Sequence, residues 1–180
     1  NTFLTDPVRV EVDRRSTTVE RIIQKVMFVA RPDKKKLLQA LLGDPAVESA
    51  IVFTRTKYGA DRVVKQLARA GIQGAAIHGN KSQNNRTRAL AGFKSGKTRV
   101  LVATDIASRG IDVDGVSHVF NYDLPNIAES YVHRIGRTAR AGRDGIAIAF
   151  CDETEVEYLI DIEALTGKSL EVVDDHEWHY

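Results

Sequence analysis

AIVFTRTKYGADRVVKQLARAGIQGAAI, residues 50–77, is the stretch that decides the fold. A short apolar run opens it, an amphipathic segment ending at Gly71 follows, and a second apolar run closes it. Two apolar runs joined by a helical segment are typical of parallel strands, because a parallel pair needs a crossover connection of that length. The stretch therefore predicts a strand–helix–strand unit.

The same alternation continues on both sides of this unit. The predicted strands are Ile22–Val29, Ala50–Phe53, Ala75–Ile77, Val100–Ala103, His118–Asn121 and Ile146–Cys151. The predicted helices are Lys34–Leu42, Tyr58–Ala70, Gln83–Phe93, Ala128–Arg137 and Glu155–Leu165, with Asp33 and Ser82 as N-caps. Because the strands are almost continuously apolar, both faces of their sheet must be covered. We predict a single α/β domain at residues 19–180, a parallel sheet with helices on both faces, preceded by a linker or edge segment at residues 1–18.

Charge is distributed unevenly along the chain. All but one of its 26 lysines and arginines lie in residues 1–151, whereas ten of its 24 aspartates and glutamates lie in residues 152–180. A basic body with an acidic end is typical of a protein that binds a polyanion. An acidic helix packed on the far side would also explain the end, and the two interpretations are compatible.

Composition also limits the compartment and the chemistry. The apolar runs are too short to cross a bilayer, and no signal peptide is visible. A single cysteine, Cys151, fits a reducing compartment, and the five histidines show no spacing suited to a metal. We expect a cytoplasmic protein with no membrane partner and no metal site of its own.

In a parallel sheet, ligands bind at the carboxyl ends of the strands. The polar residues that follow the apolar runs are therefore the first candidates for a site. They are Thr54–Lys57, His78–Asn80, Thr104–Asp105 and Asn121–Asp123.

The run from Tyr131 to Arg143 carries an arginine at every third position: 134, 137, 140 and 143. On a helix this spacing places neighbouring arginines on one face, where their charges repel one another. An anion would offset that repulsion, and the forked guanidinium suits phosphate oxygens. A solvated basic face is the alternative, but the glycines and the histidine within the run favour a phosphate site.

The segment His133-Arg-Ile-Gly-Arg-Thr-Ala-Arg140 resembles motif VI of the DEAD-box RNA helicases, although that family usually has glycine where this chain has Ala139. The segment from Ala103 to Val113 resembles motif V, with Ser108 where the family commonly has alanine. Two further segments, Ile51–Lys57 and Ile77–Arg86, resemble motif IV and the element that follows it. Over about residues 19–165 the chain resembles the C-terminal RecA-like domain of a DEAD-box ATP-dependent RNA helicase, most closely the bacterial RhlE-type branch.

The resemblance implies a role for each matching position. It assigns catalysis to Arg137 and Arg140, which with Gly110 and Asp112 would also bind ATP. It assigns the backbone of single-stranded RNA to six residues: Arg55, Thr56, Gly79, Gln83, Arg86 and Thr104. It assigns contact with the N-terminal lobe of the same protein to His133 and Arg134.

The sequence lacks the phosphate-binding loop and the Asp-Glu-Ala-Asp motif of such enzymes. The resemblance therefore implies that ATP is bound with Mg²⁺ held by a first lobe, and that this chain alone does not hydrolyse ATP. Two other functions fit the basic body. One is a stand-alone nucleic-acid-binding module, and the other is a lobe of a superfamily 2 DNA translocase.

Overall fold

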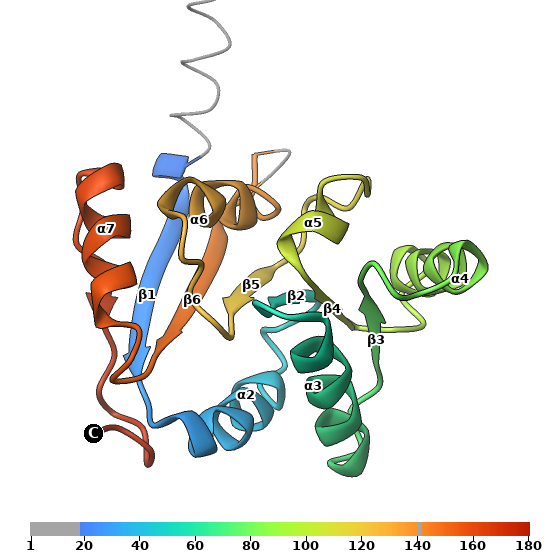
Figure 1. The fold of residues 1–180 in the computed structure, drawn as a ribbon, viewed down its shortest axis with the longest axis horizontal. Coiled ribbons are helices and arrows are strands. Elements are labelled where there is room, and N and C mark those ends of the chain that lie inside the picture. The colour runs from blue at the N-terminus through green and yellow to red at the C-terminus, as the bar shows by residue number, and fades with distance from the viewer. Residues whose placement is uncertain (1–18, 140–141) are drawn as a thin grey trace, which may run out of the picture.

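The computed structural model describes residues 19–139 and 142–180. Its centre is a seven-stranded sheet in the order β3-β4-β2-β5-β6-β1-β7 (Figure 1), in which neighbouring strands run parallel. The strands are β1 (Ile22–Phe28), β2 (Ala50–Phe53), β3 (Gly74–Ile77), β4 (Val100–Ala103), β5 (His118–Asn121), β6 (Gly145–Cys151) and β7 (Glu171–Val172). The predicted parallel sheet is confirmed, whereas the predicted segment 1–18 lies outside the described residues.

Helices cover both faces of the sheet, as predicted. On one face, a core cluster joins the strands to α2 (Lys34–Leu42) and α3 (Lys57–Arg69). Two clusters on the other face include side chains from α4 (Gln83–Lys94), α5 (Asp105–Ser108), α6 (Ala128–Ile135) and α7 (Val156–Thr166). Figure 1 shows α2 and α3 on the lower side of the molecule, with α5 and α6 on the upper side.

Strand β2 shows why the strands are apolar throughout. Val52 belongs to the cluster under α2 and α3, whereas Ile51 and Phe53 belong to the cluster under α4 and α5. Successive side chains of a strand point to opposite faces, so a strand covered on both faces has no position that favours a polar residue.

The two predicted N-caps have different outcomes. The Ser82 side chain accepts a hydrogen bond from the backbone N–H of Asn85 at 3.1 Å, which confirms it as the cap of α4. Asp33 does occupy the N-cap position of α2, but its side chain makes no cap hydrogen bond. A 3₁₀ turn (Arg31–Asp33) precedes α2 and gives Asp33 a φ of −96° and a ψ of −7°, whereas a capping residue is typically extended.

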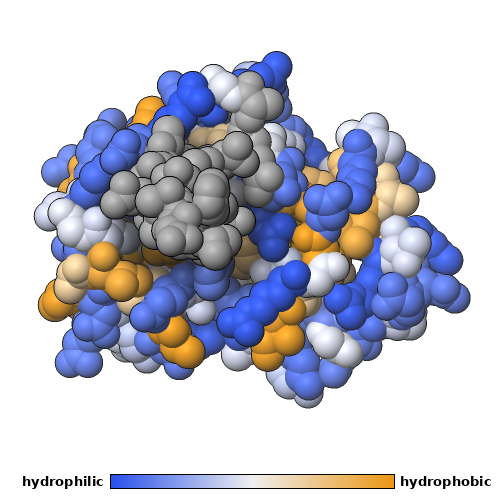
Figure 2. All heavy atoms as spheres, turned by 90° about the horizontal axis from the view of Figure 1, so that it is seen from above, coloured by the Kyte–Doolittle hydropathy of each residue, from blue (hydrophilic) through white to orange (hydrophobic). Residues whose placement is uncertain are grey.

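The described surface is largely polar. Figure 2 shows one side of the molecule, on which hydrophilic residues predominate and hydrophobic residues form small patches. No helix among the described residues is long and apolar enough to cross a membrane.

Candidate functional site

The polar residues after the strands come together at one edge of the sheet, as the topology predicts. The backbone N–H of Arg55, after β2, donates to the Asp123 carboxylate, after β5, at 2.9 Å. The carboxylate of Asp105, after β4, is held by Arg134 of α6. We call this region the strand-edge site.

Arg134 is the internal anchor of the strand-edge site. Its Nε and Nη2 donate to the two carboxylate oxygens of Asp105 at 2.6 and 2.7 Å. Its Nη1 donates to Asn121 Oδ1 at 3.1 Å and to the carbonyl of Asp123 at 2.6 Å, and the guanidinium lies over the Phe53 ring. Such a bidentate pair fixes geometry as well as charge.

The same contacts revise the interlobe role predicted for Arg134. Its side chain is only 1% exposed, so it has no surface to offer to a second lobe. We therefore assign it to positioning the ends of β4 and β5. The neighbouring His133 is exposed, and its interlobe role stays a prediction.

The segment predicted as one helix with arginines on a shared face is in fact interrupted. Helix α6 ends at Ile135, and Gly136 is its C-cap. Arg134 lies within the helix whereas Arg137 follows it, so the two do not share a helix face. Arg140 lies outside the described residues, and its predicted catalytic role stays a prediction.

Arg137 holds the loop that contains Gly110 and Asp112. Its Nη2 donates to the carbonyl of Ser108 at 2.6 Å, and its Nη1 donates to the carbonyls of Ile111 and Val113 at 3.0 and 3.3 Å. An ion pair with Asp114 at 3.7 Å adds to these bonds. The guanidinium is thus placed beside the two residues with which it was predicted to share a ligand.

Two glycines of the strand-edge site border open space. A Cβ added to Gly79 or to Gly110 would meet no atom within 4 Å, and neither backbone has a positive φ. Neither packing nor conformation within the described chain therefore requires glycine at these positions. Close approach by a bound molecule could still explain glycine at these positions, because a ligand can come closer to the backbone of glycine than to that of any other residue.

The six residues predicted to contact RNA lie at the strand ends or at the start of α4, but they differ in availability. The Arg55 Nη2 donates to the Leu124 carbonyl at 2.7 Å and to Glu155 at 3.1 Å, so its guanidinium is already engaged. Thr56 caps α3 by accepting from the Gly59 N–H. Gly79 and Gln83 are exposed, Arg86 is half-buried, and Thr104 is 9% exposed at the end of β4.

Asp61 and His78 form a pair that sequence reasoning did not identify. His78 Nδ1 accepts from the Asn80 N–H at 3.2 Å, so Nε2 is the protonated nitrogen that donates to Asp61 at 3.0 Å. Burial acts to raise the pKa of Asp61, but the bonds from His78 and Lys81 outweigh it and hold that pKa below its usual value. The pair ties the turn after β3, which contains Gly79, to α3.

A buried ion network lies behind the strand ends and was also not predicted. Lys34 is 1% exposed and contacts Glu155 at 2.8 Å, Asp152 at 3.2 Å and Asp123 at 3.7 Å. Glu155 further accepts from Arg55 and from the Leu124 N–H. The signal that could have indicated it is the position of Asp152, directly after β6 at the same edge of the sheet.

The described residues offer no metal site. They contain no group of three or more His, Cys, Asp or Glu side chains placed to hold a metal ion. Asp105, the carboxylate at the end of β4, is paired with Arg134 on both oxygens. The residues present at the strand-edge site thus do not fit a magnesium ion held by this chain.

A family model and a curated relative both match this chain to helicases. Residues 33–142 match the family model described as helicase conserved C-terminal domain. The ATP-dependent RNA helicase RhlB of Pseudomonas syringae pv. tomato is 43% identical over 168 residues, which is 93% of this chain and 42% of that protein.

Two solved structures show the same fold. The E. coli DEAD-box protein SrmB, bound to regulator of ribonuclease activity A, superposes with a TM-score of 0.84 at 36% identity, covering 88% of this chain and 94% of that one. S. cerevisiae Dbp5 bound to RNA and ADP BeF3 superposes with a TM-score of 0.79 at 31% identity, covering 96% and 50%. The chain thus spans nearly the whole of one solved chain, but less than half the length of the curated relative RhlB.

Proposed function

Since the chain belongs to the helicase conserved C-terminal domain family, in the form found in DEAD-box RNA helicases, we propose that it works as the second lobe of an ATP-dependent RNA helicase. In this proposal it supplies one wall of a cleft, and a first RecA-like lobe supplies the other. RNA and ATP bind across that cleft, on the strand-edge site.

One observation supports this proposal most directly: the attachment of Arg137 to the loop of Gly110 and Asp112. Arg137 and this loop come from two motifs that are far apart in the sequence, yet three hydrogen bonds from Arg137 to carbonyls on either side of Gly110 and Asp112 join them into one unit. A module that only binds nucleic acid has no need of a guanidinium fixed beside an exposed carboxylate and an open glycine. A nucleotide site can use all three, for phosphate, ribose and close backbone approach respectively.

For ATP, we propose that Asp112 accepts a hydrogen bond from a ribose hydroxyl while Gly110 lets the nucleotide approach the backbone. Arg137 and Arg140 act on the γ-phosphate, where a guanidinium can stabilise the charge that develops during transfer. Mg²⁺, when bound, would neutralise phosphate charge, and we assign its ligands to the first lobe, because the described residues of this chain contain no group of three or more His, Cys, Asp or Glu side chains placed to hold a metal ion.

For RNA, we propose a track along the strand ends from Thr56 through Gly79 to Thr104. Gln83 and Arg86 lie three residues apart in α4 and extend it. Contacts of this kind go to the phosphate backbone of a single strand, so they do not select a base sequence. The backbone N–H of Arg55 is bonded to Asp123 and its guanidinium to Glu155. Arg55 would therefore contact RNA directly only after its guanidinium leaves Glu155.

We further propose a cytoplasmic setting, which the single buried cysteine fits. The RhlE-type branch also stays a proposal. It rests on the resemblance of the segment His78-Gly-Asn-Lys-Ser-Gln-Asn84 to that branch.

The test compares the chain alone with the same chain joined to its first lobe. We expect RNA-stimulated ATP turnover only in the joined protein, because the phosphate-binding loop is not in this chain. Turnover by the purified chain within tenfold of a typical enzyme median of about 10 s⁻¹ would contradict the proposal that this chain supplies only one half of the ATP site.

RNA binding on the same preparations separates the alternatives. Neutralising about 2–4 phosphates should give the chain a slope of log K against log[salt] of roughly −1.4 to −2.8. A stand-alone binding module would bind RNA equally well in both preparations and show no turnover in either. Equal turnover with RNA and with DNA of the same sequence would favour the translocase, because only RNA carries the 2′-hydroxyl.

A further inference from the structure

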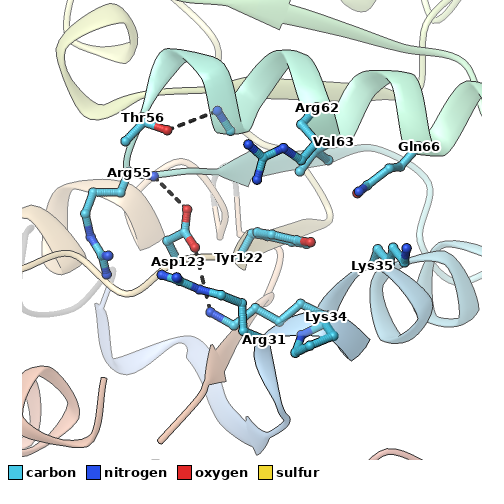
Figure 3. Close-up of a pocket in the computed structure, with 12 residues that line it drawn as sticks. Arg31, Lys34, Lys35, Arg55, Thr56, Arg62, Val63, Gln66, Tyr122 and Asp123 are labelled. Atoms are coloured by element: carbon cyan, nitrogen blue, oxygen red, sulfur yellow. Dashed lines mark hydrogen bonds and ion pairs between the residues drawn. The ribbon is translucent and has the colours of Figure 1, made fainter. Parts of the chain in front are cut away.

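A basic pocket lies between α2 and α3, and the proposed function uses only Arg55 and Thr56 of its lining. Its lining includes five cations, Arg31, Lys34, Lys35, Arg55 and Arg62, but only one carboxylate, Asp123. Its volume of about 370 Å³ is at the lower end of the range for small-molecule sites. We call it the α2–α3 pocket (Figure 3).

Helix α3 separates this pocket from most of the proposed RNA track. Gly59, Arg62 and Gln66 line the pocket at spacings of three and four residues, which places them on one face of α3. Asp61 instead bonds to His78 in the turn that contains Gly79. The two surfaces meet only at the start of α3, where Arg55 and Thr56 lie.

The charges around the pocket do not cancel. Three carboxylates neutralise three of the cations through ion pairs of 2.8–3.8 Å: Asp123, Asp152 and Glu155 with Arg31, Lys34 and Arg55. The side chains of Lys35 and Arg62 make no hydrogen bond or ion pair within the part of the chain that the structure describes. Two positive charges therefore remain facing the same space.

Neutral groups complete the pocket. Figure 3 shows the Tyr122 ring lying between Arg62 of α3 and the lysines of α2, with Gln66 on the side of the ring that carries the hydroxyl. Burial raises the pKa of Tyr122 to about 12, so its hydroxyl stays protonated and can donate at neutral pH. Both oxygens of Asp123 are already engaged, one with the Arg55 N–H and the other with Lys34, so this carboxylate is screened from an incoming anion.

From this arrangement we propose that the α2–α3 pocket binds the phosphate monoester group of a small molecule. A phosphate monoester carries a charge of about −1.5 to −2 at pH 7, which matches the two unneutralised cations. The Arg62 fork can donate two hydrogen bonds to one phosphate, Lys35 supplies a point charge, and Tyr122 supplies a neutral donor. A single carboxylate would leave one cation without a counter-charge.

Calorimetric titration of the 180-residue chain with inorganic phosphate, at constant ionic strength, tests the proposal. We expect saturable binding, accompanied by NMR shifts at the amides of Gly59 and Gln66 but not at Gly110. The double variant Arg62→Gln with Lys35→Gln should weaken binding about tenfold or more, the loss expected from removing charge-assisted hydrogen bonds.

Two single variants separate a built site from diffuse attraction. Arg62→Lys keeps the charge but loses the fork, so it should weaken binding by an intermediate factor. Arg69→Gln removes a charge from the same helix outside the pocket and should leave binding within about twofold, since an exposed charge about a Debye length away is screened.

Three results would overturn the proposal. The first is no saturable binding to the unmodified chain, and the second is an equal loss in Arg69→Gln and in the double variant. The third is that the double variant loses affinity for single-stranded RNA as strongly as for phosphate, because the pocket would then belong to the RNA track. The first two results would leave the proposed helicase function untouched.

Discussion

Ala139 has a φ of 57°, a left-handed backbone conformation that side chains other than glycine rarely adopt. The strain costs roughly 1–2 kcal/mol for an alanine. Its methyl group is nevertheless buried, with the residue 8% exposed, and burying one such carbon stabilises by about 0.8 kcal/mol. Alanine also has less freedom than glycine in the unfolded chain, which adds about 0.4–1 kcal/mol. These terms nearly cancel, so the backbone explains why the family usually has glycine here and why alanine is tolerated.

We therefore expect Ala139→Gly to change the free energy of unfolding by less than about 1 kcal/mol. Ala139→Val should lower it by about 2 kcal/mol or more, because a β-branched residue fits the left-handed region far less well. Urea unfolding of the chain measures both variants. At the exposed helical position Ala91 the order should reverse, with glycine costing more than valine. The same order at both positions would show that Ala139 is not left-handed.

Asp152 links stability to pH. Burial acts to raise its pKa, but hydrogen bonds from Thr154 and the charge of Lys34 outweigh that effect and lower it. The folded protein thus binds this proton less readily than the unfolded chain. The resulting stability is fully present above the ordinary pKa of 3.8 and is lost as the pH falls through the lowered value.

We therefore predict that the Asp152→Asn variant loses less free energy of unfolding than the unmodified chain as the pH is lowered from about 5. It should also lower stability at pH 7, because Lys34 loses one of its buried partners. Thermal unfolding at a series of pH values measures both effects. Asp174→Asn, at an exposed position, serves as the control. An unchanged slope for Asp152→Asn would mean that other carboxylates carry the acid dependence.

At the scale of elements, the start of β6 is fixed by a close approach of the backbone. A Cβ added to Gly145 would lie 2.6 Å from the backbone nitrogen of Ala139 and would overlap the Thr138 side chain. Thr138 itself donates to the carbonyl of Val116. The segment that follows Arg137 in the arginine run is therefore packed directly on the first residue of β6, and there is no space for even one additional methyl group.

We expect Gly145→Ala to lower the free energy of unfolding by about 1–3 kcal/mol, the usual cost of overpacking. Gly79→Ala is the matched control, since its Cβ would meet open space, and it should change stability by less than about 0.5 kcal/mol. Both values come from urea unfolding of the chain. Equal losses in the two variants would point to a general cost of replacing glycine and would leave no role for the contact with Thr138.

Elements formed by a compact buried run could be predicted, whereas the short elements α5 and β7 could not. Strands β2, β4 and β5 and helix α2 have the predicted bounds, because each is a compact run buried on a defined side. The four-residue helix α5 and the two-residue strand β7 contain too few residues to show any period. The end of α6 was placed two residues too late, because the arginine spacing continues past the point where the helix stops at Ile135.

The site could be predicted in its location but not in its internal bonding. Parallel topology alone places the residues after β2, β3, β4 and β5 at one edge. Which carboxylate pairs with Arg134, or that Lys34 meets Glu155 across 121 residues of sequence, depends on the folded packing. Burial also reverses the expected role of Arg134, since a charge that is satisfied internally cannot contact a second lobe.

At the scale of the whole molecule, the strand-edge site has the features of half a cleft. Its open glycines and exposed Asp112 border open space, while the guanidinium of Arg137 is bound to backbone carbonyls of its own loop. In the proposed two-lobe enzyme, a nucleotide would have to compete with those carbonyls for Arg137. Its affinity for this chain alone should consequently be low, and closure of the lobes would supply the missing contacts.

Arg140→Lys in the complete two-lobe protein tests the role assigned to the arginine run. Lysine keeps the charge but loses the fork, so RNA-stimulated ATP turnover should fall by on the order of 10³ or less, the lower end of the range for arginine fingers. RNA affinity without nucleotide should stay nearly constant, because this arginine is assigned to ATP. Arg143→Lys, an exposed arginine three residues further on in the same run, should change neither quantity. If Arg140→Lys instead keeps full turnover and loses RNA affinity, the run is an RNA-binding surface, and the γ-phosphate has to be stabilised by groups outside it.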